Sequence, residues 1–424
     1  MSSKKIIVKA LVILACLFLL SVSTYLTTTC YISSSSGDDN YNGLYGTYQG
    51  RGDIGNINLG SESESEFTVV VLPDTQFYSQ SYPEIFESQT SWIVDNKDAL
   101  NIKFVVHTGD IVNDGGDINQ WNNADSSMCV LDGIVPYIVV PGNHDYNNNC
   151  ADSPKDASNF NAYFPYSRFE GYKWYGGHYP SDGNENNYGF FSFGNQEFLV
   201  IGLEFCPTDE VLAWTDNLII NHSDKKVILF THSYMNYDNT RVDPGDFFHC
   251  KYYGCCNTSY NDGEDMWSEL VSNHSNIVLI LSGHIPGLGR RIDYVDGQPI
   301  HQILQNYQML ENGGNGWLRY YTFKPDGKIE ARTYSPYLNA YETSYNNEFD
   351  LSECEGDFER DGDVDGRDVV WFKTDIGRED SETEPLCNGD FDCDGDVDGR
   401  DVGIFKKDSG REDCPICSFS CDYW

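Results

Sequence analysis

The sequence predicts an α/β domain followed by a small all-α domain, and three observations lead to this fold class. Short apolar runs rich in Val and Ile alternate with helix-like stretches, which is the pattern of a buried sheet covered by helices. After about Asp350 the composition shifts to Asp and Gly, and a unit of about 33 residues is repeated. The 424 residues are enough for one large domain and a smaller one.

The expected strands of the large domain are apolar runs with the length of buried strands. Helix-like stretches lie between several of them, at Glu84 to Leu100 and at Glu264 to Val271. Two later segments, Trp317 to Phe323 and Lys328 to Tyr334, are separated by Pro325-Asp326-Gly327 and predict a hairpin. The apolar runs are Phe67 to Leu72, Lys103 to His107, Val135 to Val140, Phe198 to Leu203, Lys226 to Phe230 and Ile277 to Leu281.

Residues 1–32 are predicted to be a signal peptide or an N-terminal anchor. Lys4 and Lys5 precede a mostly apolar run from Ala10 to Val22, the layout of a secretory signal and shorter than a typical membrane span. Simple export is preferred, while an uncleaved anchor, or lipidation at Cys30, remains the alternative. Residues 33–66 have no apolar period and predict a flexible linker. We expect a secreted or cell-surface protein that meets a membrane only through its N-terminal segment.

Charge and cysteine content restrict the partners. A formal net charge of -39 argues against binding nucleic acid through its phosphates, because so large an excess of carboxylates leaves no room for a basic surface. Cations are the expected partners. Fourteen cysteines in an exported chain indicate disulfides, whose connectivity the sequence does not reveal. Cys414 and Cys417 have zinc-like spacing, but nearby Cys421 and the lack of a second pair favour a disulfide-tied tail over residues 414–424.

Polar residues able to bind metals follow one expected strand after another. Because ligands gather at the carboxyl ends of strands in α/β sheets, five loops are expected to converge on one crevice. Each motif alone has a structural explanation, but all five in this order are uncommon. In chain order they are Asp74 with Gln76, Gly109-Asp110, Gly142-Asn143-His144-Asp145, Thr231-His232 and Gly283-His284.

These residue types suit hydrolysis of a phosphate ester. The reaction needs hydroxide at neutral pH and cations against the phosphoryl oxygens, and two metals about 3.5 to 4 Å apart supply both. Asp110 is the expected bridging carboxylate, because the glycine before it allows close backbone approach. Imidazoles from His232 and His284 and the amide oxygen of Asn143 suit Zn, Mn or Fe.

Over most of Phe67 to Tyr337 the ordered motifs resemble the calcineurin-like metallophosphoesterases. Those enzymes carry Asp-x-His, Gly-Asp, Gly-Asn-His-Asp/Glu, a lone His and Gly-His-x-His. The resemblance implies a catalytic domain over residues 67–348, built as two mixed β-sheets flanked by helices. It also implies that His144 protonates the leaving group or steadies the phosphate, with Asp145 or Asp114 orienting it. The implied ligands of two divalent transition metals are Asp74, Gln76 and Asp110 for the first, and Asp110, Asn143, His232 and His284 for the second.

Two positions depart from the family pattern. Gln76 stands where family members usually have His, and Pro286 replaces the second His of Gly-His-x-His. The sequence "LPDTQ", with "HQILQNYQ" and "GGNGWLRYYTF", resembles a bacterial subgroup in which the glutamine is an accepted ligand. Since the first metal keeps three protein ligands, one of them a weak amide, it is expected to be the looser one. A backbone carbonyl, a water or His301 could complete it.

The repeated unit predicts two calcium-binding loops. "GDVDGRDV" occurs at Gly362 to Val369 and again at Gly395 to Val402. EF-hand-type loops place oxygen ligands at fixed positions around a glycine at position 6, and both copies fit this register. Each loop runs into a segment, with Phe372 or Phe405, that is expected to form a helix. The candidate ligands are Asp357, Glu359, Asp361, Asp363, Asp365 and Asp368 in the first loop and Asp390, Asp392, Asp394, Asp396, Asp398 and Asp401 in the second.

This pair of loops resembles dockerin modules. The resemblance implies a dockerin-like domain over residues 353–413 that folds around two Ca ions. It also implies a cohesin-like scaffold as partner, contacted through Gly366-Arg367 and Gly399-Arg400. A calcium-stapled stalk without a partner is the alternative.

The leading hypothesis is an exported metallophosphoesterase that hydrolyses a phosphomonoester or phosphodiester through hydroxide held by two metals. The alternative is a non-catalytic surface or scaffold-docked binding protein with a degenerate one-metal site. A dockerin-borne enzyme of polysaccharide breakdown ranks last, because no convincing pair of catalytic carboxylates is present. The insertion from Asn147 to Asn187, rich in Asn, Tyr and Trp, suggests a lid or a sugar-facing surface.

Overall fold

The computed structural model describes residues 66–256, 260–325, 328–344, 346–351, 366–377, 397 and 399–408. The predicted signal segment, the linker up to Ser65 and the Cys-rich tail lie outside the described residues, so these predictions stay open. Within the described ranges, none of the helices has the length and hydrophobicity required to cross a membrane.

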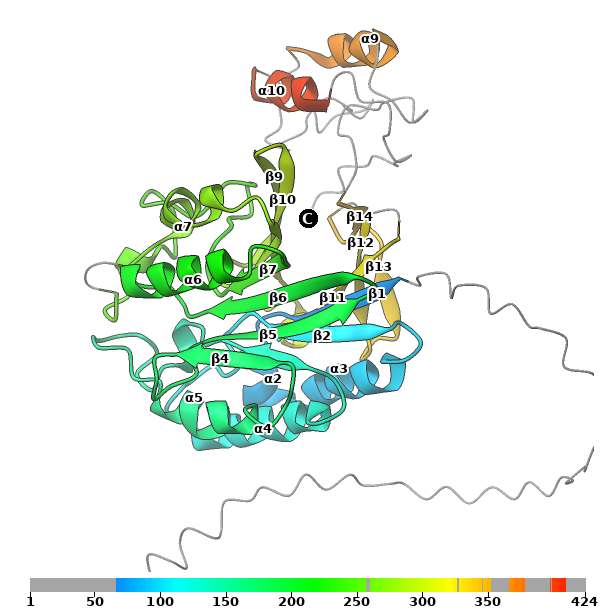
Figure 1. The fold of residues 1–424 in the computed structure, drawn as a ribbon. Coiled ribbons are helices and arrows are strands. Elements are labelled where there is room, and N and C mark those ends of the chain that lie inside the picture. Colours follow the sequence, from blue (N-terminus) through cyan, green and yellow to red (C-terminus); the bar gives the residue numbers. More distant parts are fainter. Residues whose placement is uncertain are drawn as a thin grey trace, which may run out of the picture. The chain divides into compact units, whose positions relative to one another are not determined.

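The first sheet is mixed and carries the strands that lead to the first three motifs (Figure 1). β1 (Phe67–Leu72) pairs in parallel with β2 (Ile102–His107), which pairs in parallel with β3 (Tyr137–Val139). The other edge of β1 pairs antiparallel with β11 (Leu318–Phe323), and β11 pairs with β12 (Ile329–Ser335), which confirms the predicted hairpin. Two short strands also pair with β12, namely β13 (Ala340–Glu342) and β14 (Glu348–Asp350).

The second sheet, with the order β4-β5-β6-β7-β8-β10-β9, carries the two histidine loops. Its four central strands β6, β7, β8 and β10 are parallel, and the outer pairs are antiparallel. Its strands are β4 (Tyr175–Tyr179), β5 (Asn186–Phe193), β6 (Gln196–Leu203), β7 (Lys226–Thr231), β8 (Ile277–Ser282), β9 (Gly287–Val295) and β10 (Gln298–Asn306).

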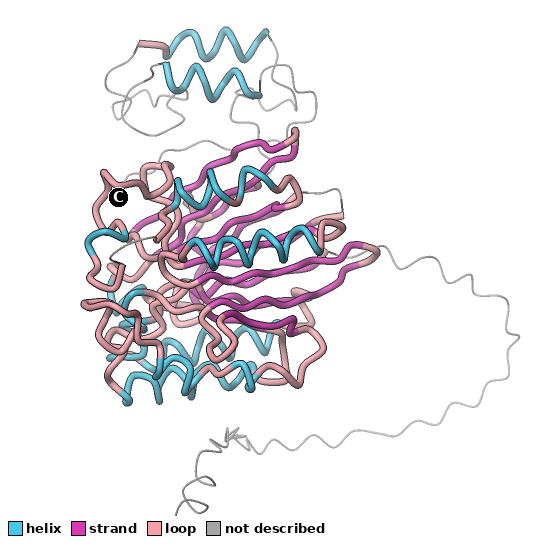
Figure 2. The backbone as a smooth tube through the Cα atoms, turned by 60° about the vertical axis from the view of Figure 1, so that its left-hand side comes forward, coloured by secondary structure: helices cyan, strands magenta, loops and turns pink. Residues whose placement is uncertain are grey.

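The two sheets pack face to face, and helices cover their outer faces, as predicted. Apolar side chains such as Val69, Phe104 and Leu279 form a core between the sheets, so the central strands are buried on both faces and read as continuous apolar runs. Figure 2 shows the strands of both sheets running side by side between helices. The first sheet is covered by α2 (Gln76–Ser81), α3 (Pro83–Asn96), α4 (Ile118–Met128) and α5 (Ser158–Tyr163), and the second by α6 (Asp209–Asn221) and α7 (Gly263–Glu269).

Local sequence signals set where these helices begin. Pro83 stands in the first turn of α3, where its missing N–H costs no helical hydrogen bond. The side chains of Asp117, Thr208 and Asp262 accept hydrogen bonds from first-turn N–H groups of α4, α6 and α7. Shorter segments are α8 (Glu311–Gly314), η1 (Cys129–Leu131), η2 (Asn143–Asp145), η3 (Tyr166–Arg168), η4 (Cys250–Tyr252) and η5 (Val271–Asn273).

The insertion from Asn147 to Asn187 is not a lid. Its aromatic side chains Phe160, Phe164 and Phe169 are buried in the core beside the first sheet, and Trp121 of α4 stacks on Tyr163 with 5.7 Å between ring centroids. The segment also supplies β4, an edge strand of the second sheet. Its aromatic content therefore reflects packing, which corrects the interpretation as a lid or a sugar-facing surface.

Both expected helices of the repeated unit are present, as α9 (Gly366–Asp375) and α10 (Gly399–Asp408). Phe372 and Phe405 stack with 4.6 Å between ring centroids, and both rings are buried. The backbone N–H of Gly377 donates to the carbonyl of Val397 at 2.9 Å. Of the predicted calcium ligands, ten lie outside the described residues, and of Asp368 and Asp401 only the helical backbone is described. The calcium sites and the cohesin partner remain predictions.

Candidate metal centre

The loops after β1, β2, β3, β7 and β8 bring the predicted ligands together. Ligand atoms of Asp110, His232 and His284 all lie within 4.8 Å of one another, and all three side chains are buried. Their strands belong to different sheets, so the cluster forms where the carboxyl ends of both sheets meet. Asp74 and Asn143 join it through the hydrogen bonds described below, which makes the predicted convergence of the loops a property of the fold.

Asp110 lies at the centre of the cluster. Its Oδ1 is 3.3 Å from Nε2 of His232 and accepts a 3.0 Å hydrogen bond from the backbone N–H of His144. Burial works to raise the pKa of Asp110, but the charges of His232 and His144 outweigh it and hold that pKa below its usual range. The φ of Gly109 is +97°, and a Cβ at Gly142 would overlap Oδ1 of Asp110. The two motifs therefore need their glycines for this close approach.

His232 is oriented by the backbone. Its Nδ1 lies 2.9 Å from the carbonyl of Thr108, which leaves Nε2 facing Asp110 and the Oδ1 of Asn143 at 3.2 Å. Burial alone would lower the pKa of His232, but the charge and hydrogen bond of Asp110 raise it to about 9. A carbonyl behind an imidazole is the usual support of a metal-binding histidine.

A backbone carbonyl also orients His284. Its Nε2 lies 2.9 Å from the carbonyl of Phe248 and 3.4 Å from the hydroxyl of Tyr253. Donation from Nε2 to the Phe248 carbonyl leaves Nδ1 as the nitrogen with a free lone pair. Burial and the charge of His232 lower the pKa of His284 to about 3, so this imidazole is neutral and its Nδ1 can accept a metal.

Asp74 is fixed by two groups from the second sheet. The backbone N–H of His284 donates to both of its oxygens, at 3.2 and 3.4 Å, and Nδ2 of Asn306 donates to Oδ2 at 2.8 Å. Burial, opposed by His232 and reinforced by the charge of Asp110, raises the pKa of Asp74 to about 8. The charge of Asp110 thus adds to the raised pKa of Asp74, and two buried carboxylates that interact in this way form a place where a cation is stabilised.

The remaining donors also fit divalent cations. Gln76 Nε2 donates to Oδ1 of Asn113 at 3.4 Å, while its Oε1 is buried without a hydrogen-bond partner. An amide oxygen left unpaired in this position is a ready ligand, because buried polar atoms almost always have partners. The cluster itself offers the carboxylates of Asp74 and Asp110, the amide oxygen of Asn143 and two imidazoles, a donor set that suits Zn, Mn or Fe.

The prediction for the partner of His144 was wrong. Its Nδ1 lies 2.8 Å from the carbonyl of Asn113, whereas Asp145 and Asp114 accept hydrogen bonds from backbone N–H groups. Asp145 accepts from Ile111, Val112 and Gly142, so it ties the loop after β2 to the loop after β3. Asp114, an exposed residue, accepts from Gly116. Both carboxylates shape the loops and do not orient the imidazole.

His301 does not reach the centre. It lies on β10 five residues before Asn306, a span of roughly 17 Å along a strand, and it lines a cavity with Phe67 and Lys324. Asn306, at the end of that strand, is the residue that sequence reasoning missed. Its signal was its place as a polar residue at the carboxyl end of a strand, close to where the other ligands lie.

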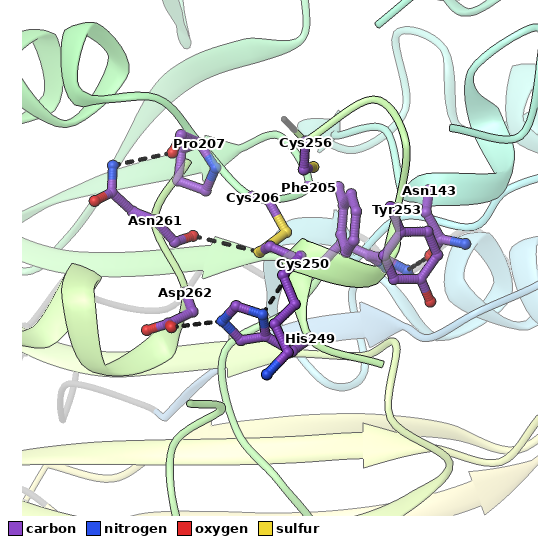
Figure 3. Close-up of a disulfide and its surroundings, with 12 residues drawn as sticks. Asn143, Phe205, Cys206, Pro207, His249, Cys250, Tyr253, Cys256, Asn261 and Asp262 are labelled. Atoms are coloured by element: carbon purple, nitrogen blue, oxygen red, sulfur yellow. Dashed lines mark hydrogen bonds and ion pairs between the residues drawn. A yellow bond between two sulfur atoms is a disulfide. The ribbon is translucent and has the colours of Figure 1, made fainter. Parts of the chain in front are cut away.

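The segment from Phe248 to Cys256, which supports His284, is tied down by two disulfides. Cys250 pairs with Cys206 in the loop after β6, and Cys255 pairs with Cys150. Figure 3 shows the first of these disulfides and the contact of His249 with Asp262. The distance from Nε2 of His249 to Oδ2 of Asp262 is 2.7 Å. Cys256 is a buried free thiol, and burial raises its pKa to about 11. For these cysteines the expectation of disulfides is met.

The chain is similar in sequence to a known protein family and to individual proteins. The profile described as calcineurin-like phosphoesterase matches residues 67–288. The chain is 38% identical over 303 residues to the uncharacterized protein YvnB of Bacillus subtilis, covering 68% of this chain and 22% of that protein. It is 23% identical over 197 residues to a probable glycerophosphodiester phosphodiesterase, GpdQ, of Arcobacter nitrofigilis, covering 43% of this chain and 55% of that protein. Among solved structures, purple acid phosphatase PPD1 of yellow lupin shares 12% identity with a TM-score of 0.44, over 68% of this chain and 54% of that one.

Fold, ligand cluster and profile together define an α/β phosphoesterase domain with a buried cluster of potential metal ligands. The chain belongs to the calcineurin-like phosphoesterase family. It spans about a fifth of the length of YvnB and about half of the GpdQ protein. Members of this family are in general hydrolases of phosphate esters that depend on metals.

Proposed function

We propose that this chain is an exported phosphoesterase that hydrolyses a phosphomonoester or phosphodiester with two divalent transition metals. The observation that carries the proposal is the convergence of Asp110, His232 and His284, with ligand atoms within 4.8 Å. Asp74, Gln76 and Asp110 would hold one metal, and Asp110, Asn143, His232 and His284 the other. When bound, such metals neutralise the phosphoryl oxygens and lower the pKa of a bound water.

His144 has the geometry of the proton donor. Its Nδ1 is held by the Asn113 carbonyl and its backbone N–H by Asp110, so the ring position is fixed while Nε2 is left available. In its doubly protonated form this imidazole can give the Nε2 proton to the departing oxygen, which takes the electron pair of the breaking P–O bond while hydroxide forms the new P–O bond. The phosphodiesterase activity in the name of the GpdQ protein supports the diester as one substrate class.

The test is a metal and activity measurement on the full-length protein. We expect two transition metals per chain by elemental analysis, and hydrolysis within a panel of phosphomonoesters and phosphodiesters. Asp110→Asn should reduce kcat/KM by about 10³-fold or more and lower the metal content, because a bridging ligand is lost. Asp216→Asn, at an aspartate on α6 that contacts His274, is the matched control and should change neither. No hydrolysis across the panel would reject the proposal.

A non-catalytic protein with one metal is the second candidate, and Gln76 and Pro286 are the observations that favour it. The first metal lacks both histidines of the family pattern. One metal per chain together with no turnover would select this candidate.

The C-terminal repeat is proposed to be a dockerin-like module that binds two Ca ions and docks to a cohesin-like scaffold. The stacked pair Phe372 and Phe405 supports a packed unit. Calcium titration of the full-length chain should show two sites that are lost when Asp361 and Asp394 are both replaced by Ala.

Export is tested by N-terminal sequencing of the protein recovered outside the cell. A cleaved signal gives a sequence that begins near residue 33, whereas an uncleaved anchor leaves residues 1–32 in place.

A further inference from the structure

Two aromatic side chains of the disulfide-tied segment lie beside His284. The ring centroid of Tyr253 is 5.6 Å from that of His284, and the ring of Phe248 is 6.1 Å away. The ring of Phe205 packs against the rings of Tyr253 and His284, with 5.0 Å between centroids in each pair. We call Phe248 and Tyr253 the aromatic wall of the centre.

The wall belongs to an exposed apolar surface. Phe248 is 50% exposed, and its neighbours Phe247 and Tyr252 are 84% and 62% exposed. Folding normally buries such rings, because burial of apolar surface stabilises the protein by about 25 cal/mol per Å². A cluster of exposed aromatic residues beside a reactive centre is typical of a surface that contacts a ligand.

The backbone of this segment is fixed rather than adaptable. Cys250 and Cys255 anchor it through disulfides, and His249 accepts a hydrogen bond from the N–H of Lys251. Phe248 has a φ of +63°, a conformation that bulky side chains rarely adopt. That conformation accompanies the contact of its carbonyl with His284 and leaves its ring half exposed. Strained residues persist where the surrounding structure holds them, and they cluster at ligand sites.

The side chains of the ligand cluster have no Lys or Arg partner among the described residues. The hydrogen bonds and ion pairs of Asp74, Asp110, His144, His232 and His284 are made with other groups. Lys251 of the disulfide-tied segment lies over the ring of Tyr252, with its Nζ 4.9 Å from the ring centroid. The aromatic faces of the wall favour flat, apolar groups.

We propose that the centre prefers phosphate esters whose organic group is aromatic or otherwise planar and apolar, with that group packed on Phe248 and Tyr253. This inference rests on the proposed function, since it assigns the phosphate to the metal centre. The proposed substrate class is narrower than phosphate esters in general.

The test compares two non-hydrolysable probes, phenylphosphonate and methylphosphonate, by calorimetry on the metal-loaded full-length protein. Both carry the same phosphonate, so their affinity ratio isolates the contribution of the ring. We expect phenylphosphonate to bind about tenfold more tightly, the size of one well-packed aromatic contact. Phe248→Ala and Tyr253→Leu should each reduce this ratio toward one.

Two controls separate the wall from general effects. Tyr253→Phe keeps the ring and should keep the ratio, and Tyr341→Ala, at an exposed tyrosine on the edge strand β13, should leave it unchanged. A ratio near one in the unmodified protein, or a ratio that survives both wall substitutions, overturns the inference. If esters are hydrolysed in that case, the proposed function stands without it. If neither probe binds and no ester is hydrolysed, the proposed function and this inference both fail.

Discussion

The side-chain amide of Asn306 donates a 2.8 Å hydrogen bond to Oδ2 of Asp74, across 232 positions of the sequence. The bond links the end of β10 in one sheet to the loop after β1 in the other. Because the second oxygen of a carboxylate is fixed by its partner, this contact sets which way Asp74 faces.

Asn306→Ala is expected to weaken metal binding at the first site about 10- to 100-fold, the usual effect of losing a partner of a ligand. Metal content after dialysis against graded chelator concentrations measures this change. Asn276→Ala, which removes an amide that donates to the carbonyl of Lys225 away from the centre, is the control. Equal metal retention in the two variants would show that Asn306 does not support a ligand.

Much of the fold was predictable, because its strands carry strong signals. The central strands are buried on both faces and read as continuous apolar runs, and β11 and β12 are separated by a Pro-Asp-Gly turn. β9 (Gly287–Val295) was missed because it contains Gly, Arg and Asp and lies at the edge of its sheet, where pairing with β10 decides its structure. β4 was missed for the same reason.

The predicted ligands of the centre converge because short polar motifs directly follow buried strands. What could not be predicted are contacts made by main-chain atoms. The carbonyls of Thr108, Phe248 and Asn113 orient His232, His284 and His144, and a carbonyl is present at every residue, so its identity carries no signal. The assignment of Asp145 to His144 failed for this reason.

His144→Ala should lower kcat more for an ester with a poor leaving group than for one with a good leaving group. For an alkyl ester we expect a loss of about 10²- to 10⁴-fold, whereas a 4-nitrophenyl ester, which departs without a proton, should lose much less. Steady-state kinetics with both esters give the comparison. His178→Ala, at a histidine that stacks on Tyr166, should leave both rates unchanged. A similar loss with both esters would indicate that His144 binds the phosphate and does not donate a proton.

Replacing both Cys206 and Cys250 by Ser is expected to lower the free energy of unfolding by about 4 kcal/mol, from the loop-entropy relation for a 44-residue separation. Urea unfolding of the metal-loaded protein measures it. Because Phe248 and Tyr253 contact His284, the same variant should also release metal at lower chelator concentration. Loss of stability with unchanged metal affinity would show that the disulfide does not position His284.

Glu185→Gln is expected to stabilise the protein by about 1 kcal/mol where the pH exceeds the raised pKa of this carboxyl. One oxygen of Glu185 accepts from Asn161, while the other is buried without a partner, and burial raises the pKa of this carboxyl above its ordinary 4.5. A raised folded-state pKa means that the contribution of Glu185 to stability is fully present below pH 4.5 and is lost as the pH rises through the folded-state pKa. The gain should therefore be absent at pH 4 and present at pH 7. Urea unfolding at both values measures it, with exposed Glu87→Gln on α3 as control, and an equal effect at both pH values would contradict it.

Gln76→His addresses the weaker half of the centre. Gln76 Oε1 is a buried, unpartnered amide oxygen, and an imidazole nitrogen binds borderline metals more strongly than an amide does. The variant is therefore expected to retain its first metal at about tenfold higher chelator concentration. Gln196→His on β6, remote from the centre, should leave metal retention as it is. If Gln76→His instead loses metal, the side chain at position 76 is fitted to an oxygen ligand, and the glutamine is a feature of this centre rather than a defect in it.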